Sequence, residues 1–331
     1  MALTDEGIID VPGMLSRWVR LPNGTKAHYT TSGTSGPAVI LMHGGITGSS
    51  GLAGWRYMAP FLGDNGFRVY CPDYPGFGLT ENYEEVYPPG AGTHVDFTHD
   101  FATALCLDKF HLSGNSMGCA NAVNYITAHP ERVLNYALIA GSIGEIVPWS
   151  EIRAKDTRTE AEKPNIMEFD GTPESMKALM SAIILDPSKI TEDLTNMRTL
   201  AANKNRDYYA KFIHAWTIGA DENAMARLNT KGRFDRMVSI PGIYLYGTED
   251  VLWPHTLSGY MQEDALSHVQ FFYPENTGHQ GQTDQPELFN QVFLEFFRDG
   301  KVSWATAQKA GISTRRPPLP NLVEVPEGMA V

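Results

Sequence analysis

The feature that most constrains this chain is a Gly-x-Ser-x-Gly motif at residues 114–118, directly after the short apolar run 110–112 and before a helix-competent run. In this strand–turn–helix setting, Ser116 is held in a strained turn at the carboxyl end of a strand, with its hydroxyl exposed. Gly114 and Gly118 let the strand and the helix approach each other without Cβ clashes. A glycine-rich turn without a chemical role is the alternative, so the rest of the chain must decide between them.

Continuous apolar runs, typical of strands buried on both faces of a parallel sheet, recur along the chain with helical stretches between them. They are 38–42, 67–71, 110–112, 133–140, 242–247 and 269–273. This alternation stops between about 141 and 234, where the pattern is helical only. We therefore predict an α/β fold of the α/β-hydrolase type, in which residues 1–140 and 235–300 form a mostly parallel sheet core. Residues 141–234 would form an inserted helical cap, or lid, and the proline-rich residues 301–331 an extended tail.

The composition limits the partners and the location of the protein. A formal net charge of −12 argues against binding to nucleic acid or to anionic membrane surfaces. No apolar run approaches the roughly 20 residues that a membrane span needs, and the N-terminal residues lack a signal-peptide pattern. The three cysteines have no metal-ligand spacing and point to a reducing compartment. We expect a cytoplasmic protein that acts on a small molecule, and the tail suggests a homodimer.

A serine nucleophile needs a base that takes its proton and an acid that orients this base. In chains with this kind of turn, the three residues come in the order Ser, acid, His, each on a loop after a strand. Asp250 and His279 both follow a predicted buried strand in this order. We therefore predict a catalytic triad of Ser116, Asp250 and His279, with Glu249 as the alternative acid. Such a triad needs no cofactor and no metal ion, and we predict neither.

The loop after the strand 38–42 begins with His43, Gly44 and Gly45 and suits an oxyanion hole. One donor should be the backbone N–H of Met117, the residue after the nucleophile. The other should be the backbone N–H of Gly45, with Gly44 allowing a close approach. We expect His43 to shape this loop and not to act as a base.

On these motifs the sequence resembles the serine α/β-hydrolases that cleave carbon–carbon bonds in meta-cleavage products of aromatic-ring degradation. The resemblance covers about residues 18–298 and includes the serine turn with Asn115, the loop 43–45 and the loop 73–78. Three runs of the expected cap also resemble the cap helices of that family: 172–177, 186–194 and 196–198. The resemblance implies that Arg198 binds the carboxylate of a dienoate substrate, for which a planar guanidinium is suited. A helical arginine on the surface is the alternative.

The chain departs from this family at positions expected to face the substrate. Gln280 follows the predicted catalytic histidine, where the family usually has Trp, and no Asn stands near Gly54, where the family has one. Cleavage of a carbon–carbon bond needs a carboxylate anchor and polar groups around the dienolate. Arg198, Asn115 and His279 would supply them.

Two other functions remain open. A carboxylesterase or lactonase needs only the triad, the oxyanion donors and an apolar pocket, and the changed polar positions favour it. The same fold also serves as a non-catalytic binding protein, but such proteins often lose a triad member, and none is missing here. In the leading interpretation the substrate is apolar and derived from an aromatic compound.

Overall fold

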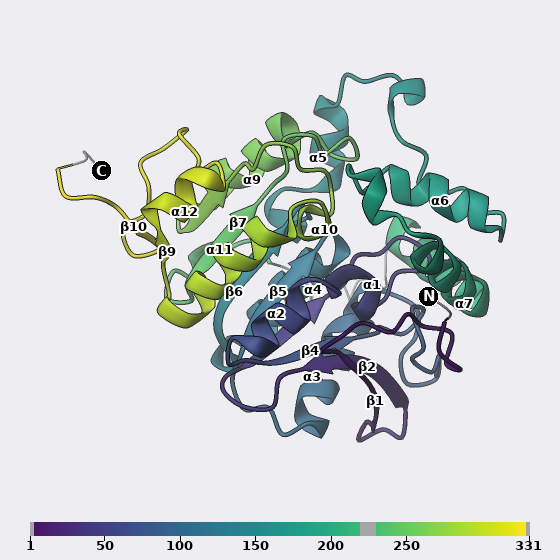
Figure 1. The fold of residues 1–331 in the computed structure, drawn as a ribbon. Coiled ribbons are helices and arrows are strands. Elements are labelled where there is room, and N and C mark those ends of the chain that lie inside the picture. Colours follow the sequence, from purple (N-terminus) through teal and green to yellow (C-terminus); the bar gives the residue numbers. More distant parts are fainter. Residues whose placement is uncertain (1–2, 219–229, 329–331) are drawn as a thin grey trace.

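The computed structural model describes residues 3–218 and 230–328, and one eight-stranded sheet runs through it in the order β1-β2-β4-β3-β5-β6-β7-β8 (Figure 1). Its strands are β1 (Leu15–Arg20), β2 (Lys26–Ser32), β3 (Ala38–Met42), β4 (Arg68–Pro72), β5 (Phe110–Asn115), β6 (Val133–Ile139), β7 (Gly242–Leu245) and β8 (Val269–Phe272). The pairs β1–β2 and β2–β4 are antiparallel, and all other neighbours are parallel. The predicted mostly parallel α/β sheet is confirmed.

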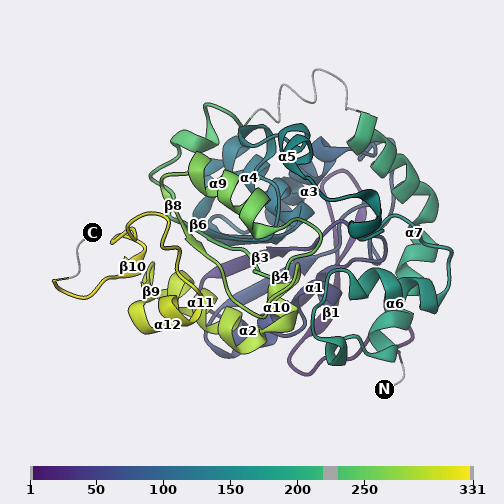
Figure 2. The ribbon, with the colours of Figure 1, turned by 90° about the horizontal axis from the view of Figure 1, so that it is seen from above.

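Helices cover both faces of this sheet (Figure 2). One layer contains α1 (Gly51–Trp55), α2 (Met58–Asp64), α10 (Gly281–Asp284) and α11 (Pro286–Asp299), and the other contains α3 (Ala91–Ala104), α4 (Met117–Ala128) and α9 (Tyr260–Ala265). Strand β3 explains why both layers are needed, because successive side chains of a strand point to opposite faces. Val39 and Leu41 join the core under the first layer, and Ile40 and Met42 join the core under the second.

Between β6 and β7, the described residues form helices, short 3₁₀ turns and loops, without a strand. The helices are α5 (Trp149–Lys155), α6 (Pro173–Ser181) and α7 (Glu192–Ile218). α6 and α7 pack against each other outside the two helix layers, at one end of the molecule (Figures 1 and 2). Their apolar residues Met176, Met180, Leu194 and Met197 are buried in the core shared with the first layer. The expected cap also includes residues 219–229, which lie outside the described residues.

The C-terminal residues differ from the extended tail that we predicted. They form the helix α12 (Trp304–Lys309) and the parallel strand pair β9 (Val302–Ser303) and β10 (Val323–Glu324). Ser303 caps the helix by accepting a hydrogen bond from the backbone N–H of Thr306. The prediction of a wholly extended tail is therefore wrong. The reason is that Ala307, Ala310 and Leu322 are buried and supply an apolar face for this segment; residues 329–331 lie outside the described residues.

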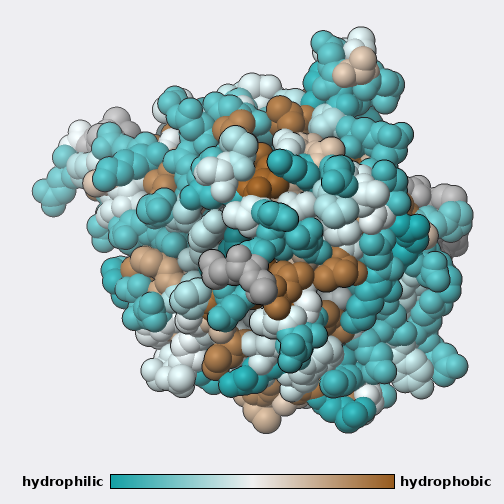
Figure 3. All heavy atoms as spheres, turned by 45° about the vertical axis from the view of Figure 1, so that its right-hand side comes forward, coloured by the Kyte–Doolittle hydropathy of each residue, from teal (hydrophilic) through white to brown (hydrophobic). Residues whose placement is uncertain are grey.

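The surface in Figure 3 is mostly hydrophilic, with hydrophobic residues gathered in small groups. None of the helices in the described ranges is both long enough and apolar enough to cross a membrane.

Candidate active site

The serine turn has the strained geometry that its glycines predict. Ser116 connects β5 to α4 with φ 59° and ψ −119°, a left-handed backbone that a non-glycine residue rarely adopts. A Cβ on Gly114 would lie 2.0 Å from the carbonyl oxygen of Gly118, and a Cβ on Gly118 would lie 2.3 Å from that of Met42. The backbone N–H of Ser116 donates to Ile139 in the neighbouring strand at 2.9 Å. Both glycines are therefore required for the turn.

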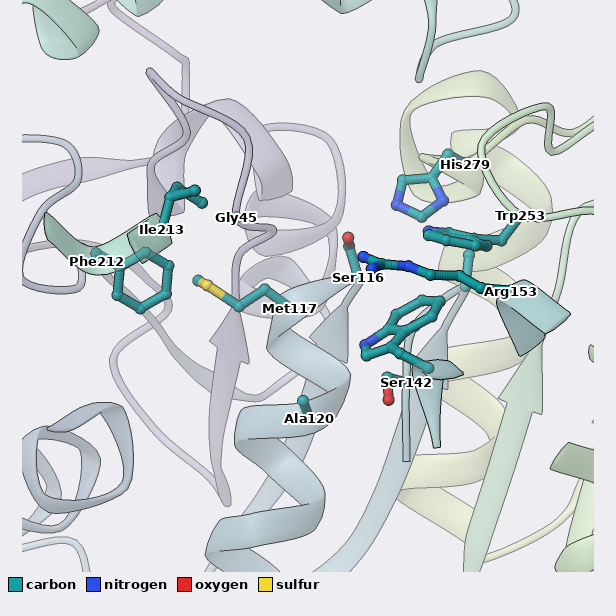
Figure 4. A pocket seen from close by; sticks show the side chains of 13 residues that line it. Gly45, Ser116, Met117, Ala120, Ser142, Arg153, Phe212, Ile213, Trp253 and His279 are labelled. Atoms are coloured by element: carbon teal, nitrogen blue, oxygen red, sulfur yellow. The ribbon is translucent and has the colours of Figure 1, made fainter. Parts of the chain in front are cut away.

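His279 and Asp250 meet beside this turn, on loops that follow β8 and β7. The Nδ1 atom of His279 lies 2.8 Å from Oδ2 of Asp250, and both residues are buried. The other oxygen of Asp250 accepts the backbone N–H groups of Leu252 at 2.9 Å and Trp253 at 3.1 Å. With Nδ1 donating to the carboxylate, Nε2 of His279 is a proton acceptor. Figure 4 shows the His279 ring next to Ser116.

The Nε2 atom of His279 is buried and has no hydrogen-bond partner among the described residues. His279 and Ser116 line the same cavity side by side. Catalytic hydrogen bonds are often long before substrate binds and tighten in the complex, so this geometry suits a base and a nucleophile at rest.

Glu249, the alternative acid, has a different position. It is exposed, and its Oε2 atom accepts hydrogen bonds from the backbone N–H of Thr277 at 2.9 Å and from the Thr248 hydroxyl at 2.6 Å. Glu249 thus holds the loop that leads to His279, whereas Asp250 contacts the imidazole itself.

The residues expected to form the oxyanion hole lie together beside the serine. A Cβ on Gly45 would lie 2.9 Å from Cβ of Met117, and one on Gly44 would lie 3.4 Å from Cβ of Ser116. The carbonyl of Gly45 accepts the hydroxyl of Tyr209 in α7 at 3.0 Å. Larger residues at these two positions would therefore press against the serine turn.

His43 shapes this loop, as expected from the sequence. Its Nδ1 donates to the carbonyl of Gly44 at 2.7 Å, and its Nε2 accepts the backbone N–H of Tyr74 at 3.2 Å. Burial lowers the pKa of His43, although the nearby Asp73 opposes this shift. With both nitrogens occupied and the ring neutral, His43 has no free atom for catalysis.

A cavity of about 290 Å³ opens beside Ser116 and His279. Its walls are mainly apolar and aromatic, with side chains of Met117, Trp149, Phe212, Ile213 and Trp253. The rings of Trp149 and Trp253 pack with their centroids 4.2 Å apart. Arg153 of α5 also lines this cavity, and our sequence reasoning did not identify it. Its position four residues after Trp149 was the available signal, because such residues share one helix face.

A second crevice, too narrow to hold a water molecule, is lined by Ser49, Asn115 and Gln280 and shares Gly45, Ser116 and His279 with the larger cavity. The side-chain amide of Asn115 donates to the carbonyls of Ile139 at 3.1 Å and His279 at 3.0 Å. Asn115 thus joins the serine turn to the histidine loop. Gln280 is buried, and its backbone N–H donates to Ile183 at 2.9 Å, next to α6.

Arg198 of α7 lies next to Ser49 of this crevice. Only 1% of the residue is exposed, so the alternative prediction of a helical arginine on the surface is wrong. Its Nη2 donates to the hydroxyl of Ser49 at 3.2 Å, while Nε is buried and finds no hydrogen-bond partner among residues 3–218 and 230–328. Within the described ranges, no carboxylate lies within ion-pair distance of Arg198. Burial, and next the charge of Arg56, lower the pKa of Arg198 to about 10, so the guanidinium stays charged at neutral pH.

Asp284 is a further residue that the sequence did not reveal. One carboxylate oxygen accepts the backbone N–H groups of Leu185 at 2.8 Å and Asp186 at 3.1 Å. The other oxygen accepts the backbone N–H of Gly278, the residue before His279, at 2.9 Å. Burial raises the pKa of Asp284, and these three hydrogen bonds oppose the shift. A single carboxylate therefore joins the segment after α6 to the histidine loop.

Among the described residues, no group of three or more His, Cys, Asp or Glu side chains is arranged to hold a metal ion. The site is thus built from the serine turn, the Asp250–His279 pair, the glycine loop and the two cavities.

Curated relatives of this chain are named as hydrolases of ring-fission products. One is a 2-hydroxy-6-oxononadienedioate/2-hydroxy-6-oxononatrienedioate hydrolase of Paraburkholderia phymatum, 26% identical over 285 residues, covering 83% of this chain and 93% of that protein. Another is a 2-hydroxy-6-oxo-6-phenylhexa-2,4-dienoate hydrolase of Burkholderia cepacia, 28% identical over 294 residues, covering 83% and 92%. The resemblance inferred from the sequence is confirmed.

Among solved structures, a 2-hydroxy-6-oxo-6-phenylhexa-2,4-dienoate hydrolase from Rhodococcus sp. strain RHA1 superimposes with a TM-score of 0.69. It is 25% identical and covers 86% of this chain and 99% of that chain. The family model described as alpha/beta hydrolase fold matches residues 37–286, which include β3 to β8 and the whole candidate site. The chain therefore belongs to the α/β-hydrolase fold family.

Proposed function

We propose that this protein is a serine hydrolase that cleaves a carbon–carbon bond in a meta-cleavage product, with Ser116, His279 and Asp250 as its catalytic triad. The observation that carries the proposal is the buried Nε2 atom of His279, which has no partner in the described part of the chain, while Nδ1 is held by Asp250 at 2.8 Å. An imidazole in this state is ready to take a proton from Ser116. The curated relatives named above support the choice of substrate.

In the proposed reaction, Nε2 of His279 accepts the proton of the Ser116 hydroxyl as its oxygen attacks the ketone carbonyl of the substrate. The negative charge that develops on the carbonyl oxygen would be stabilised by the backbone N–H groups of Gly45 and Met117, with Gly44 leaving room for it. Asp250 keeps the imidazole in the correct tautomer throughout. The positive end of α4, which begins at Met117, favours the same charge.

The dienoate part of the substrate would occupy the crevice beside Ser49, whose walls would have to move apart because the crevice is too narrow for a water molecule in the free enzyme. Arg198 is fully buried and donates to Ser49 of this crevice, and it would bind the dienoate carboxylate together with the Ser49 hydroxyl. Asn115 and Gln280 would border the dienolate. The carbon–carbon bond breaks only after the dienol has become a ketone, and polar groups along the crevice would assist this proton shift.

We further propose that residues 141–234 act as a cap over the site. Five side chains of this segment line the same cavity as Ser116: Ser142, Trp149, Arg153, Phe212 and Ile213. The cap would exclude water and select the substrate. We expect the enzyme to act on a small molecule in the cytoplasm and to form a homodimer.

Esterase or lactonase activity is the second candidate. Two features favour this candidate. Arg198 does not line the crevice itself but contacts Ser49, which does, and Gln280 stands where the family usually has Trp. A neutral ester needs the triad, the oxyanion donors and the larger apolar cavity, but no carboxylate anchor.

The test is a parallel turnover assay with a 2-hydroxy-6-oxo-dienoate, an aryl ester and an aryl lactone, using the wild type and Ser116→Ala as a control. The proposal expects the highest kcat/KM for the dienoate and loss of all turnover in Ser116→Ala. Turnover of the ester or lactone alone would make the second candidate the function. No turnover of any substrate by a folded wild type would favour the non-catalytic alternative.

A further inference from the structure

The larger cavity contains a cation that neither the triad nor the dienoate crevice uses. The guanidinium end of Arg153 reaches into the cavity toward Ser116, with His279 and Trp253 beside it (Figure 4). Apart from Ser116, Ser142 and His279, the side chains named above as walls of this cavity are apolar or aromatic. Arg153 is itself an exposed residue, so water can reach it from outside while its guanidinium end faces the cavity.

Arg153 also differs from the two cations that follow it most closely in the chain. Lys155 on the same helix pairs with Glu151 at 3.4 Å, and Arg158 pairs with Asp156 at 2.9 Å. Arg153 has no ion pair within the described part of the chain, and the charge of its guanidinium is therefore available to a ligand.

Ser116 lies between the sites that the two parts of the substrate would occupy. Ser116 and Gly45 line both the crevice and the larger cavity, so the reacting carbonyl would lie where the two meet. If the dienoate enters the crevice near Ser49, the acyl part on the other side of the broken bond must lie in the larger cavity. Arg153 would therefore meet the acyl part and not the dienoate.

We propose that Arg153 is a specificity-determining residue that binds a second carboxylate, carried by the acyl part, and that the preferred substrate is a ring-fission product with two carboxylates. This inference rests on the proposed function and names its substrate class. The curated relatives include enzymes named for both kinds of acyl part, a dienedioate and a phenyl-substituted dienoate. Aromatic walls alone would fit either kind. The guanidinium distinguishes them, because it can form charge-assisted hydrogen bonds only with the anion.

The reaction remains a simple hydrolysis. The hydroxyl of water is added to the acyl carbon, the bond to the dienoate carbon breaks, and the hydrogen of water goes to that carbon. The acyl part then leaves as a dicarboxylic acid.

The experiment compares Arg153→Gln with Lys155→Gln, which removes the same charge from the same helix at a residue that does not line the cavity. Both variants and the wild type are assayed with a dienedioate and with a phenyl-substituted dienoate. Arg153→Gln should lower kcat/KM for the dienedioate by roughly 10-fold or more and change the phenyl substrate by less than about 3-fold. Lys155→Gln should leave both unchanged. The proposal would be overturned if Arg153→Gln lowered kcat/KM by the same factor for both substrates. It would also be overturned if Lys155→Gln lowered kcat/KM for the dienedioate alone as strongly as Arg153→Gln does.

A second pair of substrates keeps this test separate from the proposed carbon–carbon cleavage. The 4-nitrophenyl monoester of adipic acid and 4-nitrophenyl hexanoate place an anionic and a neutral acyl chain of equal length in the same cavity. Arg153→Gln should selectively lower the acylation rate with the adipate ester, even if no dienoate is cleaved. If both dienoates fail while this selectivity holds, the proposed function is wrong and the anion-binding role of Arg153 stands. If the dienoates are cleaved and the selectivity is absent in both pairs, only the role of Arg153 is wrong.

Discussion

Replacing Arg198 with methionine separates what its charge does to folding from what it does for the substrate. Methionine keeps much of the length and the packing of the arginine stem but removes the guanidinium. The structure gives that guanidinium a hydrogen bond to Ser49 and no carboxylate partner within the described ranges. We therefore expect Arg198→Met to stabilise the free enzyme and to impair binding of a carboxylate substrate.

The magnitude follows from the pKa of Arg198, which burial lowers by between two and three pKa units from its ordinary value to about 10. A pKa unit corresponds to 1.36 kcal/mol, so at neutral pH the folded state holds this charge at a cost of about 3 kcal/mol. Loss of the hydrogen bond to Ser49 offsets about 1 kcal/mol of the gain. For a chain of 331 residues, the remaining 2 kcal/mol correspond to a rise in Tm of about 3 °C.

The sign of this effect on the unfolding free energy can be tested by varying the pH. Because the folded pKa of Arg198 lies below the unfolded value, its destabilising effect is complete well below pH 10 and shrinks as the pH rises through about 10. The advantage of Arg198→Met in unfolding free energy should therefore be constant near neutrality and shrink toward alkaline pH.

The functional arm measures kcat/KM of Arg198→Met with a dienoate and with a neutral ester. Truncation of one partner of a buried ion pair typically removes 2–5 kcal/mol, so the dienoate should lose roughly 30-fold or more. The ester should change little. A variant that is less stable than the wild type and loses both activities equally would refute the reasoning, since Arg198 would then support the cap and not the substrate.

Three further predictions concern the serine turn and its supports. Ser116→Ala and His279→Ala should each lower kcat by roughly 10⁴-fold or more with an unchanged circular dichroism spectrum; retention of a hundredth of the activity would contradict the triad. Asp250→Asn should be nearly as damaging, whereas Glu249→Gln should retain most of its kcat, and the opposite order would make Glu249 the acid. Gly118→Ala should fail to accumulate as a soluble protein, because its Cβ would lie 2.3 Å from the carbonyl oxygen of Met42; a soluble and active variant would show that the turn can relax.

The elements around the serine could be predicted because their signals are local. The continuous apolar run of β3 follows from burial on both faces, and the turn at Ser116 follows from glycines at fixed spacing. The loops that carry Asp250 and His279 were found because parallel strands end at the same edge of the sheet. Each of these features depends on a few consecutive residues.

The remaining features depend on contacts between distant parts of the chain. Arg153 and Arg198 are both helical arginines in the sequence, and only packing makes one line the cavity and buries the other. The helix α12 was missed because proline-rich residues later in the tail dominated its pattern, while its apolar residues gain their partners only in the folded core.

The three hydrogen bonds of Asp284 connect the segment after α6 to the loop that carries the base. Leu185 and Asp186 follow α6, and Gly278 precedes His279, so one carboxylate holds both segments. A displacement of the segment after α6 would therefore act on the same carboxylate that holds the backbone before His279. If this segment moves with the proposed cap, the admission of a substrate and the alignment of the base are coupled through a single side chain.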